Sequence, residues 1–588
     1  MAGTMGGAMN MDGGDPRMNS SAGLGFGVAS EVTRPAALKL HDPSITFEEY
    51  MHYAAITRAD DRHITVGQED TALSVAGLKG LNPFAKKREP AVETVTQMNE
   101  KTASSSPDRQ PYTITEEEYV QASRAVRTAT WGAVFFLITT DILGPFSTAW
   151  AFRQMGYGPG AVLYTIFAAF AGYGGYLLWR MFLGLDSDKY PLRTYGDIAF
   201  RVYGQTVRYG VNILQTFQLL FNVGIIIVTN GQSLSQMAAK GPNLDQNGAC
   251  FIVLCFVWAI AGMLLGQIRT LARLGHLANF AIWLNVIVII ATMAVVAHST
   301  PNYVAANTAY MINPGPVITT AGPPAGVGFQ GQIVGLMQAV YSYGGAMLFV
   351  EFMAEMKRPW DFWKGMLCAQ TFIYFVYMLF GLFVYSYQGQ FTIIIAYQGI
   401  SNYAWQTVAN AFGLTSGLIA ALLYGNIGIK VVYNNVLMEF FRFPSLATKA
   451  GKLAWIAVVP VYWALAFIIA SAIPQVSNLS GFIAAFCILQ FSYTFPPFLH
   501  MGFQIKKAAI QSGEGFDPAT GQTVRHDNGM KRWIRGYKKD IALNTFHLIF
   551  FLGSFVTAVL GVYSAIIGMI ASYATGATST FSCNSPVL

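Results

Sequence analysis

Charged residues are scarce in this sequence of 588 residues. They make up 11% of the chain, whereas apolar residues make up 53% and an ordinary soluble domain carries about 25% charged residues. This balance excludes a water-soluble globular domain and predicts an integral membrane protein that lies in a lipid bilayer. The net charge of +7 forms no Lys/Arg-rich stripe with interleaved aromatic residues, so we expect no nucleic-acid partner.

Signals for catalysis, metals and cofactors are also missing. Of the eight histidines only His547 lies well inside an apolar run, and there is no His-rich or Cys-spaced ligand pattern. The segment GKLAW at 451–455 lacks the upstream glycine and the following Ser or Thr of a phosphate-binding loop. We therefore expect no enzyme, no metal site and no bound cofactor.

Cysteine is rare, with five in the chain. Cys255, Cys368 and Cys487 fall within apolar runs, where cysteine is usually a small packing residue. Cys250 and Cys583 lie between or beyond these runs, and the spacing leaves open whether they form a disulfide or stay free.

The first 118 residues contain no apolar run long enough to cross a membrane. Gly and Met crowd residues 1–27, and the apolar core of a secretory signal is absent, so we predict a mostly disordered tail that stays in the cytosol. Cytosolic regulators are its candidate partners. Within it, residues 44–63 place apolar side chains at helical intervals, which predicts a short helix that is either docked or solvated.

Long apolar runs alternate with short polar connections from Thr128 onward. Runs of 18 or more apolar residues are typical of transmembrane helices, and we count eleven in a domain spanning 119–572, followed by a short tail at 573–588. The eleven predicted spans are 129–152, 159–184, 209–237, 249–266, 274–297, 331–353, 365–386, 407–438, 453–473, 478–502 and 541–572.

Basic residues are distributed unequally between the connections. Twenty-one of them fall in connections on one face, against Arg153 and Lys240 on the other, and residues 298–330 carry no Asp, Glu, Lys or Arg. Positively charged short loops stay cytoplasmic, so the bias predicts a cytosolic amino terminus and a carboxyl terminus outside the cell or in a lumen. We favour the plasma membrane over the vacuolar membrane.

The first span is interrupted by TTDILGPFSTAW, residues 139–150. Pro145 removes a helical hydrogen bond and Gly144 relaxes the backbone, which frees polar groups at membrane depth. Asp141 lies about twelve residues into the span, near the midplane at 1.5 Å per residue, where an ionisable side chain predicts a functional site. The alternative is a simple proline kink in which Asp141 has only a structural hydrogen bond.

A second interruption occurs in the sixth span. There Gly344 and Gly345 follow Tyr343 at mid-depth, with Glu351 one to two turns later. Interruptions in corresponding places of the first and sixth spans predict an inverted repeat of five plus five helices, with a ligand site between the breaks.

Several segments resemble motifs of one family. GPFSTAWAFRQMG (144–156), QIRTL (267–271), SYGGAMLFVEFMAEMKRPWDF (342–362) and IGIKVVYNNVLMEF (427–440) are, in order, similar to patterns of the amino acid/auxin permease family, and especially of its fungal neutral amino acid permeases. The chain departs from the family pattern at three positions. Ala149 replaces the usual proline, Trp150 replaces the usual tyrosine, and a proline stands earlier in the motif, at Pro145.

This resemblance implies an all-α, LeuT-like fold of the APC superfamily with one extra helix, and secondary active transport of neutral or aromatic amino acids by alternating access, commonly with protons. Amides at 144–147 would receive the substrate carboxylate and carbonyls at 342–345 its ammonium group. Aromatic side chains would line the pocket. The candidate substrate-binding residues are Asp141, Gly144, Pro145, Phe146, Ser147, Trp150, Phe221, Ser342, Tyr343, Gly344 and Gly345.

Two charges at mid-depth are candidates for coupling. Asp141 in the first span and Lys430 in the eighth would be neighbours in a LeuT-like arrangement, where they would either load and release a proton or form a permanent salt bridge. A sodium-coupled carrier, an exchanger and an amino acid sensor built on a transporter fold remain alternatives.

Overall fold

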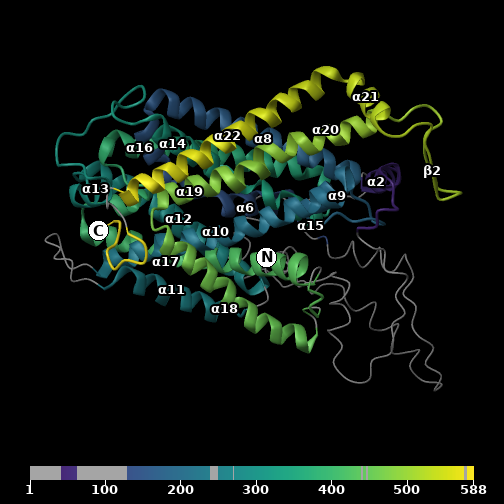
Figure 1. The fold of residues 1–588 in the computed structure, drawn as a ribbon. Coiled ribbons are helices and arrows are strands. Elements are labelled where there is room, and N and C mark those ends of the chain that lie inside the picture. The colour runs from purple at the N-terminus through teal and green to yellow at the C-terminus, as the bar shows by residue number, and fades with distance from the viewer. Residues whose placement is uncertain are drawn as a thin grey trace, which may run out of the picture.

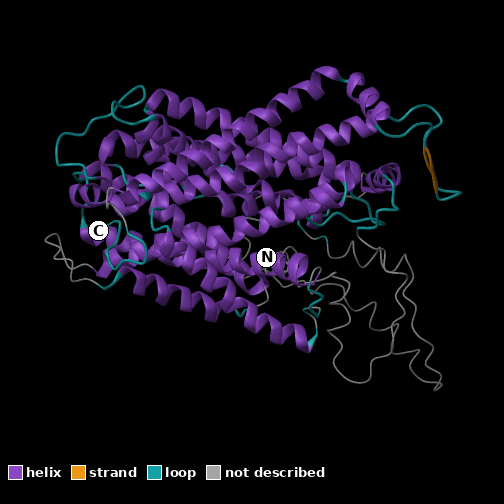
Figure 2. Ribbon diagram, in the orientation of Figure 1, coloured by secondary structure: helices purple, strands orange, loops and turns teal. Residues whose placement is uncertain are grey.

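The structure is a computed structural model that describes residues 41–61, 127, 129–238, 249–268, 271–438, 441–444, 446, 448–574 and 579–587. The predicted disorder of residues 1–40 and 62–118 lies outside the described residues. Within them the chain is mostly helical, and its only strands form a small antiparallel hairpin, β1 (Gly515–Asp517) and β2 (Gln522–Val524) (Figure 2). The predicted all-α polytopic membrane fold is confirmed.

A helix, straight or broken, coincides with each of the eleven predicted spans. The helices of this bundle are α6 (Trp131–Ile142), α7 (Thr148–Met155), α8 (Tyr157–Leu185), α10 (Gln205–Ala238), α11 (Phe251–Leu265), α12 (Leu271–His298), α14 (Phe329–Ser342), α15 (Phe349–Glu355), α16 (Phe362–Gln388), α17 (Tyr403–Val432), α18 (Lys449–Ala472), α19 (Val476–Ile483), α20 (Phe495–Ala508) and α22 (Ile541–Ala574).

Not all of these helices reach the length of a membrane crossing. Eight segments are long and apolar enough as they stand, and two bent pairs, α6 with α7 and α14 with α15, qualify when each pair is taken as one span. Helix α11 has 15 residues, or about 22 Å at 1.5 Å per residue, against a hydrocarbon core of about 30 Å. Whether α11, which corresponds to the predicted span 249–266, crosses the membrane therefore stays a prediction, and with it the total of eleven crossings.

Smaller elements lie at the two ends of the bundle or join its helices. Four are α-helices and the rest are short stretches of 3₁₀ or π-helix. They are α2 (Phe47–Asp61), α9 (Tyr195–Tyr203), α13 (Tyr303–Tyr310), α21 (Met530–Lys539), η3 (Pro145–Ser147), η4 (Gly344–Leu348), η5 (Pro359–Asp361), η6 (Gly389–Phe391), η7 (Ala396–Gly399), η8 (Tyr433–Met438), η9 (Ala484–Ile488) and η10 (Gln490–Thr494).

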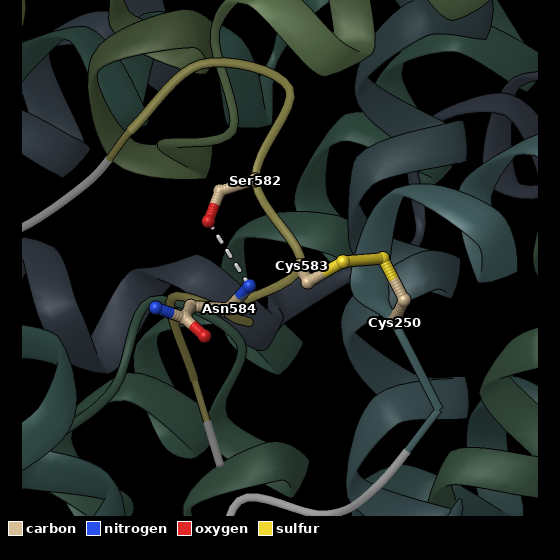
Figure 3. The surroundings of a disulfide bond; sticks show 4 residues. All are labelled: Cys250, Ser582, Cys583 and Asn584. Atoms are coloured by element: carbon tan, nitrogen blue, oxygen red, sulfur yellow. Dashed lines mark hydrogen bonds between the residues drawn. A yellow bond between two sulfur atoms is a disulfide. The ribbon is translucent and has the colours of Figure 1, made fainter.

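The two ends of the bundle differ in what closes them. One end, which we call the capped end, carries α2, the β-hairpin and α21; the opposite end, which we call the disulfide end, carries α13 and the last described residues (Figure 1). At the disulfide end Cys250 and Cys583 form a disulfide (Figure 3), and the Phe251 amide donates to the Cys583 carbonyl at 3.0 Å. The structure thus settles the pairing that the sequence left open.

Small residues let the helices pack closely, as is common in membranes. A Cβ on Gly262 of α11 would lie 2.1 Å from the Trp463 ring of α18, and one on Gly174 of α8 would lie 2.3 Å from the Ser492 carbonyl. Large apolar side chains point outward from the same helices, including Leu264, at 70% exposure, and Leu453. Such a surface suits lipid rather than water.

The helix predicted within residues 44–63 is α2, and it is docked. Phe47, Tyr50 and Ala54 recur at three- and four-residue intervals and are buried, so they form one apolar face. This face packs against α8 and α9, and the Phe47 ring contacts that of Phe503 in α20. The partner of this helix is therefore the same chain.

Candidate binding site

The first broken span bends by 42° between α6 and η3–α7. Helix α6 ends at Ile142, and Gly144 has φ −163° and ψ 71°, outside the helical region. Pro145 explains the position of the break, since it lacks an N–H and disfavours helical geometry in the residue before it. The interruption predicted from Gly144 and Pro145 is confirmed.

Side chains from two neighbouring helices satisfy the backbone groups that this break exposes. Tyr377 of α16 donates its hydroxyl hydrogen to the Ile142 carbonyl at 2.6 Å and accepts from the Gly144 amide at 3.2 Å. Asn285 of α12 donates to the Leu143 carbonyl at 3.4 Å. Unwound backbone at membrane depth is tolerated only where such partners or a cavity are present.

The second broken span bends by 40° between α14 and η4–α15. Close packing is the main constraint on the break here: a Cβ on Gly344 would lie 2.7 Å from Cγ2 of Ile488. The Ser342 hydroxyl, at the end of α14, donates to the Gln338 carbonyl of its own helix at 2.7 Å. Tyr343 is fully buried, with its ring 6.1 Å from that of Tyr164 and 5.9 Å from that of Tyr377. Tyr377 therefore touches both breaks.

A cavity of about 270 Å³ lies between the two breaks. Binding pockets for drug-sized ligands measure roughly 300–1,000 Å³, so this one suits a smaller molecule. Its walls come from α6, η3, α10, α12, α14, η4, α16, α17, α19, η9 and the loop around η7. The residues that carry its polar side chains are Thr140, Ser147, Gln218, Asn222, Thr229, Asn230, Asn285, Gln338, Tyr341, Ser342, Tyr377, Tyr397, Ser416, Tyr424 and Ser480.

The described lining contains hydroxyl and carboxamide groups but no Asp, Glu, Lys, Arg or His. The side chain of Asp141 lies outside what the structure describes, although its neighbours Thr140 and Ile142 both line the cavity. A pocket of this kind can hold a ligand of zero net charge through hydrogen bonds, without the cost of desolvating an unpaired charge.

Six of the predicted binding residues line this cavity, namely Gly144, Phe146, Ser147, Ser342, Gly344 and Gly345. The Phe146 ring meets that of Tyr397 edge to face, with centroids 5.0 Å apart.

Four others lie outside the described lining. Pro145, Trp150 and Tyr343 are buried in the surrounding core, and Phe221 packs on Phe482 with centroids 5.8 Å apart. A role of these four in binding stays a prediction.

Lys430 is buried in α17, at 1% exposure, and is not among the lining residues that the structure describes. Since the side chain of Asp141 is not described, the predicted Asp141–Lys430 pair also stays a prediction.

A polar stripe on α10 was missed by the sequence reasoning. Gln218, Asn222 and Asn230 face the cavity. They belong to two runs of polar residues at three- or four-residue intervals, Gln215 to Asn222 and Thr229 to Gln236, which are separated by an apolar stretch at 223–228. That spacing places them on one helix face, so it is the signal that could have identified them. Within the described residues, Gln218 Oε1 and Asn222 Oδ1 have no hydrogen-bond partner, which leaves two acceptors for a ligand.

Comparisons with known proteins match most of the chain. Residues 127–514 match the family model described as "Transmembrane amino acid transporter protein". A "Transmembrane transporter" of Fusarium pseudograminearum is 24% identical over 70% of this chain and 79% of its own length. An "N amino acid transport system protein" of Neurospora crassa is 23% identical over 65% and 78%. A "Transmembrane transporter" of Gibberella moniliformis is 26% identical over 52% of this chain, and this match covers 62% of the relative's own length.

Proposed function

The chain belongs to the transmembrane amino acid transporter protein family, and on this premise we propose that it carries neutral amino acids across a membrane by alternating access, with protons as the coupling ion. The observation that carries the proposal is the cavity between the two helix breaks, whose described lining has hydroxyl and carboxamide groups but no charged side chain. An amino acid with a neutral side chain is a zwitterion of zero net charge, which such a lining accommodates.

The two breaks supply opposite partial charges for the two ends of the zwitterion. The amino-terminal end of η3–α7 is positive and would receive the carboxylate near Ser147, whereas the carbonyl end of α14 is negative and would receive the ammonium group near Ser342. Gln218 and Asn222 add acceptors on the facing wall. Phe146 and Tyr397 would contact an apolar or aromatic substrate side chain.

We extend the proposal to the LeuT-like inverted repeat. The breaks fall in the first and sixth helical spans, each with its shorter piece after the break. In an inverted repeat these two spans are counterparts, and the ligand lies between them. Helix α22 then follows the ten helices of the two repeats as an additional helix.

The proposed orientation places the capped end in the cytosol. The excess of basic residues in the connections on that face supports it, and so does the disulfide at the opposite end, because disulfides persist in oxidising compartments outside the cytosol. We propose that the protein lies in the plasma membrane, where the disulfide end would face the exterior of the cell.

Transport by purified protein in liposomes tests the proposal. A panel of radiolabelled amino acids should show concentrative uptake of neutral ones when the exterior is acid, and none driven by sodium alone. Substrate binding without flux would contradict the transporter and favour the sensor. Flux that follows sodium and ignores pH would contradict proton coupling. Family membership supports a transporter over an enzyme. Catalytic turnover of a substrate would contradict the proposal that the protein is a transporter and not an enzyme.

A further inference from the structure

Helix α2 lies across both halves of the bundle at the capped end. We define the first half as residues 129–298, from α6 to α12, and the second half as residues 329–508, from α14 to α20. Helix α21 is fixed to the second half, because Arg535 donates at 2.8 Å to the carbonyl of Ala509, directly after α20, and a Cβ on Gly536 would lie 2.1 Å from the Ile505 carbonyl oxygen. The β-hairpin is held to α21 by the ion pair of Arg532 with Glu514, directly before β1, at 2.8 Å.

Ion pairs and hydrogen bonds join α2 to the first half. Arg58 Nη2 lies 2.6 Å from Asp186 Oδ2, in the loop that follows α8. In the same loop the Tyr190 hydroxyl donates to Glu49 at 2.6 Å. Just before α2, His41 Nε2 lies 2.7 Å from Asp197 Oδ1 in α9.

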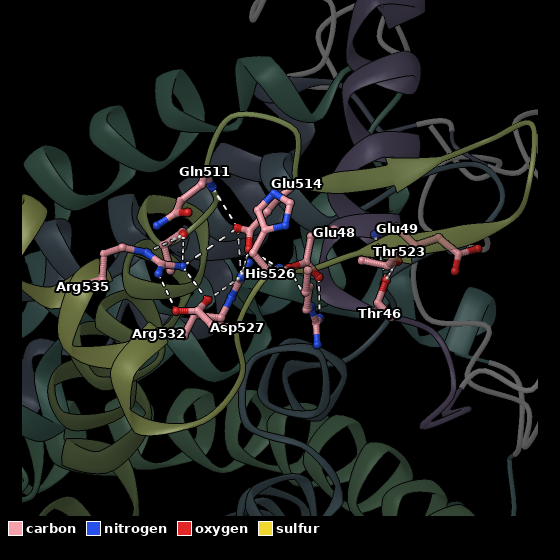
Figure 4. Close-up of polar contacts among 12 residues, drawn as sticks. Thr46, Glu48, Glu49, Gln511, Glu514, Thr523, His526, Asp527, Arg532 and Arg535 are labelled. Atoms are coloured by element: carbon pink, nitrogen blue, oxygen red, sulfur yellow. Dashed lines mark hydrogen bonds and ion pairs between the residues drawn. The ribbon is translucent and has the colours of Figure 1, made fainter.

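A second set of contacts joins the same helix to the hairpin and α21 (Figure 4). Glu48 forms a two-point ion pair with the Arg525 guanidinium, with Nε at 3.0 Å, and a further contact of 3.0 Å with Arg532 Nη2. At the start of α2 the hydroxyls of Thr46 and Thr523 are 2.6 Å apart.

Most of the charged groups in these contacts are buried, although the side chains of Arg525 and His41 are 33% and 26% exposed. Glu48, Arg58, Asp186, Asp197 and Arg532 are each at most 9% exposed. Breaking one partner of a buried pair is costly because the other charge is left uncompensated. At neutral pH the acids stay charged: burial alone would raise the pKa of Asp186, but Arg127 and Arg58 hold it below its usual value, and Arg525 does the same for the pKa of Glu48.

Motion in transporters built from inverted repeats is largely a rocking of one repeat or bundle against the other. An element bonded to both halves at one end resists their separation at that end. The described lining of the cavity includes no residue of α2, α9 or α15, so these elements of the capped end do not form part of its described wall. We propose that α2 is a strap that holds the capped end closed, and that its release from the β-hairpin and α21 is required before the cavity opens there. This inference rests on the proposed transport function.

A reversible cross-link tests the strap directly. In the double variant Thr46→Cys with Thr523→Cys, the two thiols should form a disulfide under mild oxidation, because the native hydroxyls are 2.6 Å apart. The cross-linked protein should still bind a mixture of the twenty radiolabelled amino acids in detergent, yet lose at least about tenfold in liposome uptake, equivalent to about 1.4 kcal/mol. Reduction should restore uptake. The wild type and each single-cysteine variant, treated identically, are the controls.

Three outcomes of this experiment would overturn the strap: cross-linked protein that transports at the uncross-linked rate, loss of binding together with uptake, or thiols that fail to bond. If the uncross-linked protein takes up no amino acid at all, the proposed transport function is contradicted instead. The strap is then tested by hydrogen exchange, which does not depend on transport.

Hydrogen exchange supplies that independent measurement. Glu48→Arg should speed amide exchange in both α9 and the β-hairpin, since one strap covers both regions. Lys531→Glu is the matched control, because Lys531 is exposed beside Arg532 and forms no ion pair among the described residues. Unchanged exchange in Glu48→Arg, or a change confined to the hairpin, would contradict the strap.

Discussion

The two helix breaks that frame the cavity are held open by different means. At the first, hydroxyl and carboxamide groups of Tyr377 and Asn285 take over hydrogen bonds that the helix has lost. At the second, the tight approach of Gly344 to Ile488 and the enclosed ring of Tyr343 fix the backbone by shape. The first break depends on polar partners from other helices and the second on the absence of a side chain.

This difference has a consequence for motion. A break held by hydrogen bonds can exchange those partners for water or substrate at small net cost, because a typical hydrogen bond contributes only about 1 kcal/mol net. A break held by close packing cannot deform without losing many contacts at once. The first break is therefore suited to adjust to the substrate, and the second to keep a fixed shape against which it adjusts.

The largest effect is expected at the packed break. Gly344→Leu places four carbon atoms where one Cβ would already lie 2.7 Å from Ile488, so uptake should fall below detection with the protein still in the membrane. Gly172→Leu in α8 is the matched control, because a Cβ there meets no atom within 4 Å. Normal uptake by Gly344→Leu would show that shape does not define the second break.

The next effect tests whether the first break also carries the coupling proton. Asp141→Asn and Lys430→Met should each abolish uptake driven by an acid exterior, while substrate exchange at equal pH survives. Under the alternative of a permanent salt bridge, both variants would lose thermal stability and exchange together. Accumulation that still follows the pH gradient in either variant would rule out the proposed pair.

A smaller loss is expected when the polar support is removed. Tyr377→Phe leaves the Ile142 carbonyl and the Gly144 amide without their partner. Both residues line the cavity, so we expect the low end of the usual penalty, about 1 kcal/mol for each group, which together predict a loss of roughly 30-fold in uptake. Tyr374→Phe is the control, since its hydroxyl bonds Thr165 in an exposed position. Equal uptake in the two variants would contradict the dependence of the first break on the Tyr377 hydroxyl.

The smallest effect is expected for Asn285→Ala. Its single contact with the Leu143 carbonyl is long, at 3.4 Å, and such a weak bond is worth well under about 1 kcal/mol. Uptake should therefore fall by less than about fivefold, measured beside Tyr377→Phe. A larger loss in Asn285→Ala than in Tyr377→Phe would show that Asn285, and not Tyr377, is the more important support of the first break.

The sequence predicted features that depend on local chemistry. Gly144 with Pro145, and Gly344 beside Tyr343, located both breaks, because proline and glycine act on their own backbone. The supports could not be predicted, since Tyr377 follows Gly144 by 233 residues and only the packing of α16 on α6 brings them together. The same holds for Glu48 and Arg525, which are 477 residues apart. The stripe on α10 was within reach of the sequence, because helical spacing alone displays it.

The disulfide between Cys250 and Cys583 has a consequence for the order of events in biosynthesis. Its two cysteines are separated by 333 residues, and every helix from α11 to α22 lies between them. The second thiol therefore reaches the first only after the ribosome has finished all of these helices and α22 has been inserted. Closure of this bond marks a chain whose insertion is complete, and a cell that inspects membrane proteins for unpaired thiols would retain one whose last helix had failed to enter the bilayer.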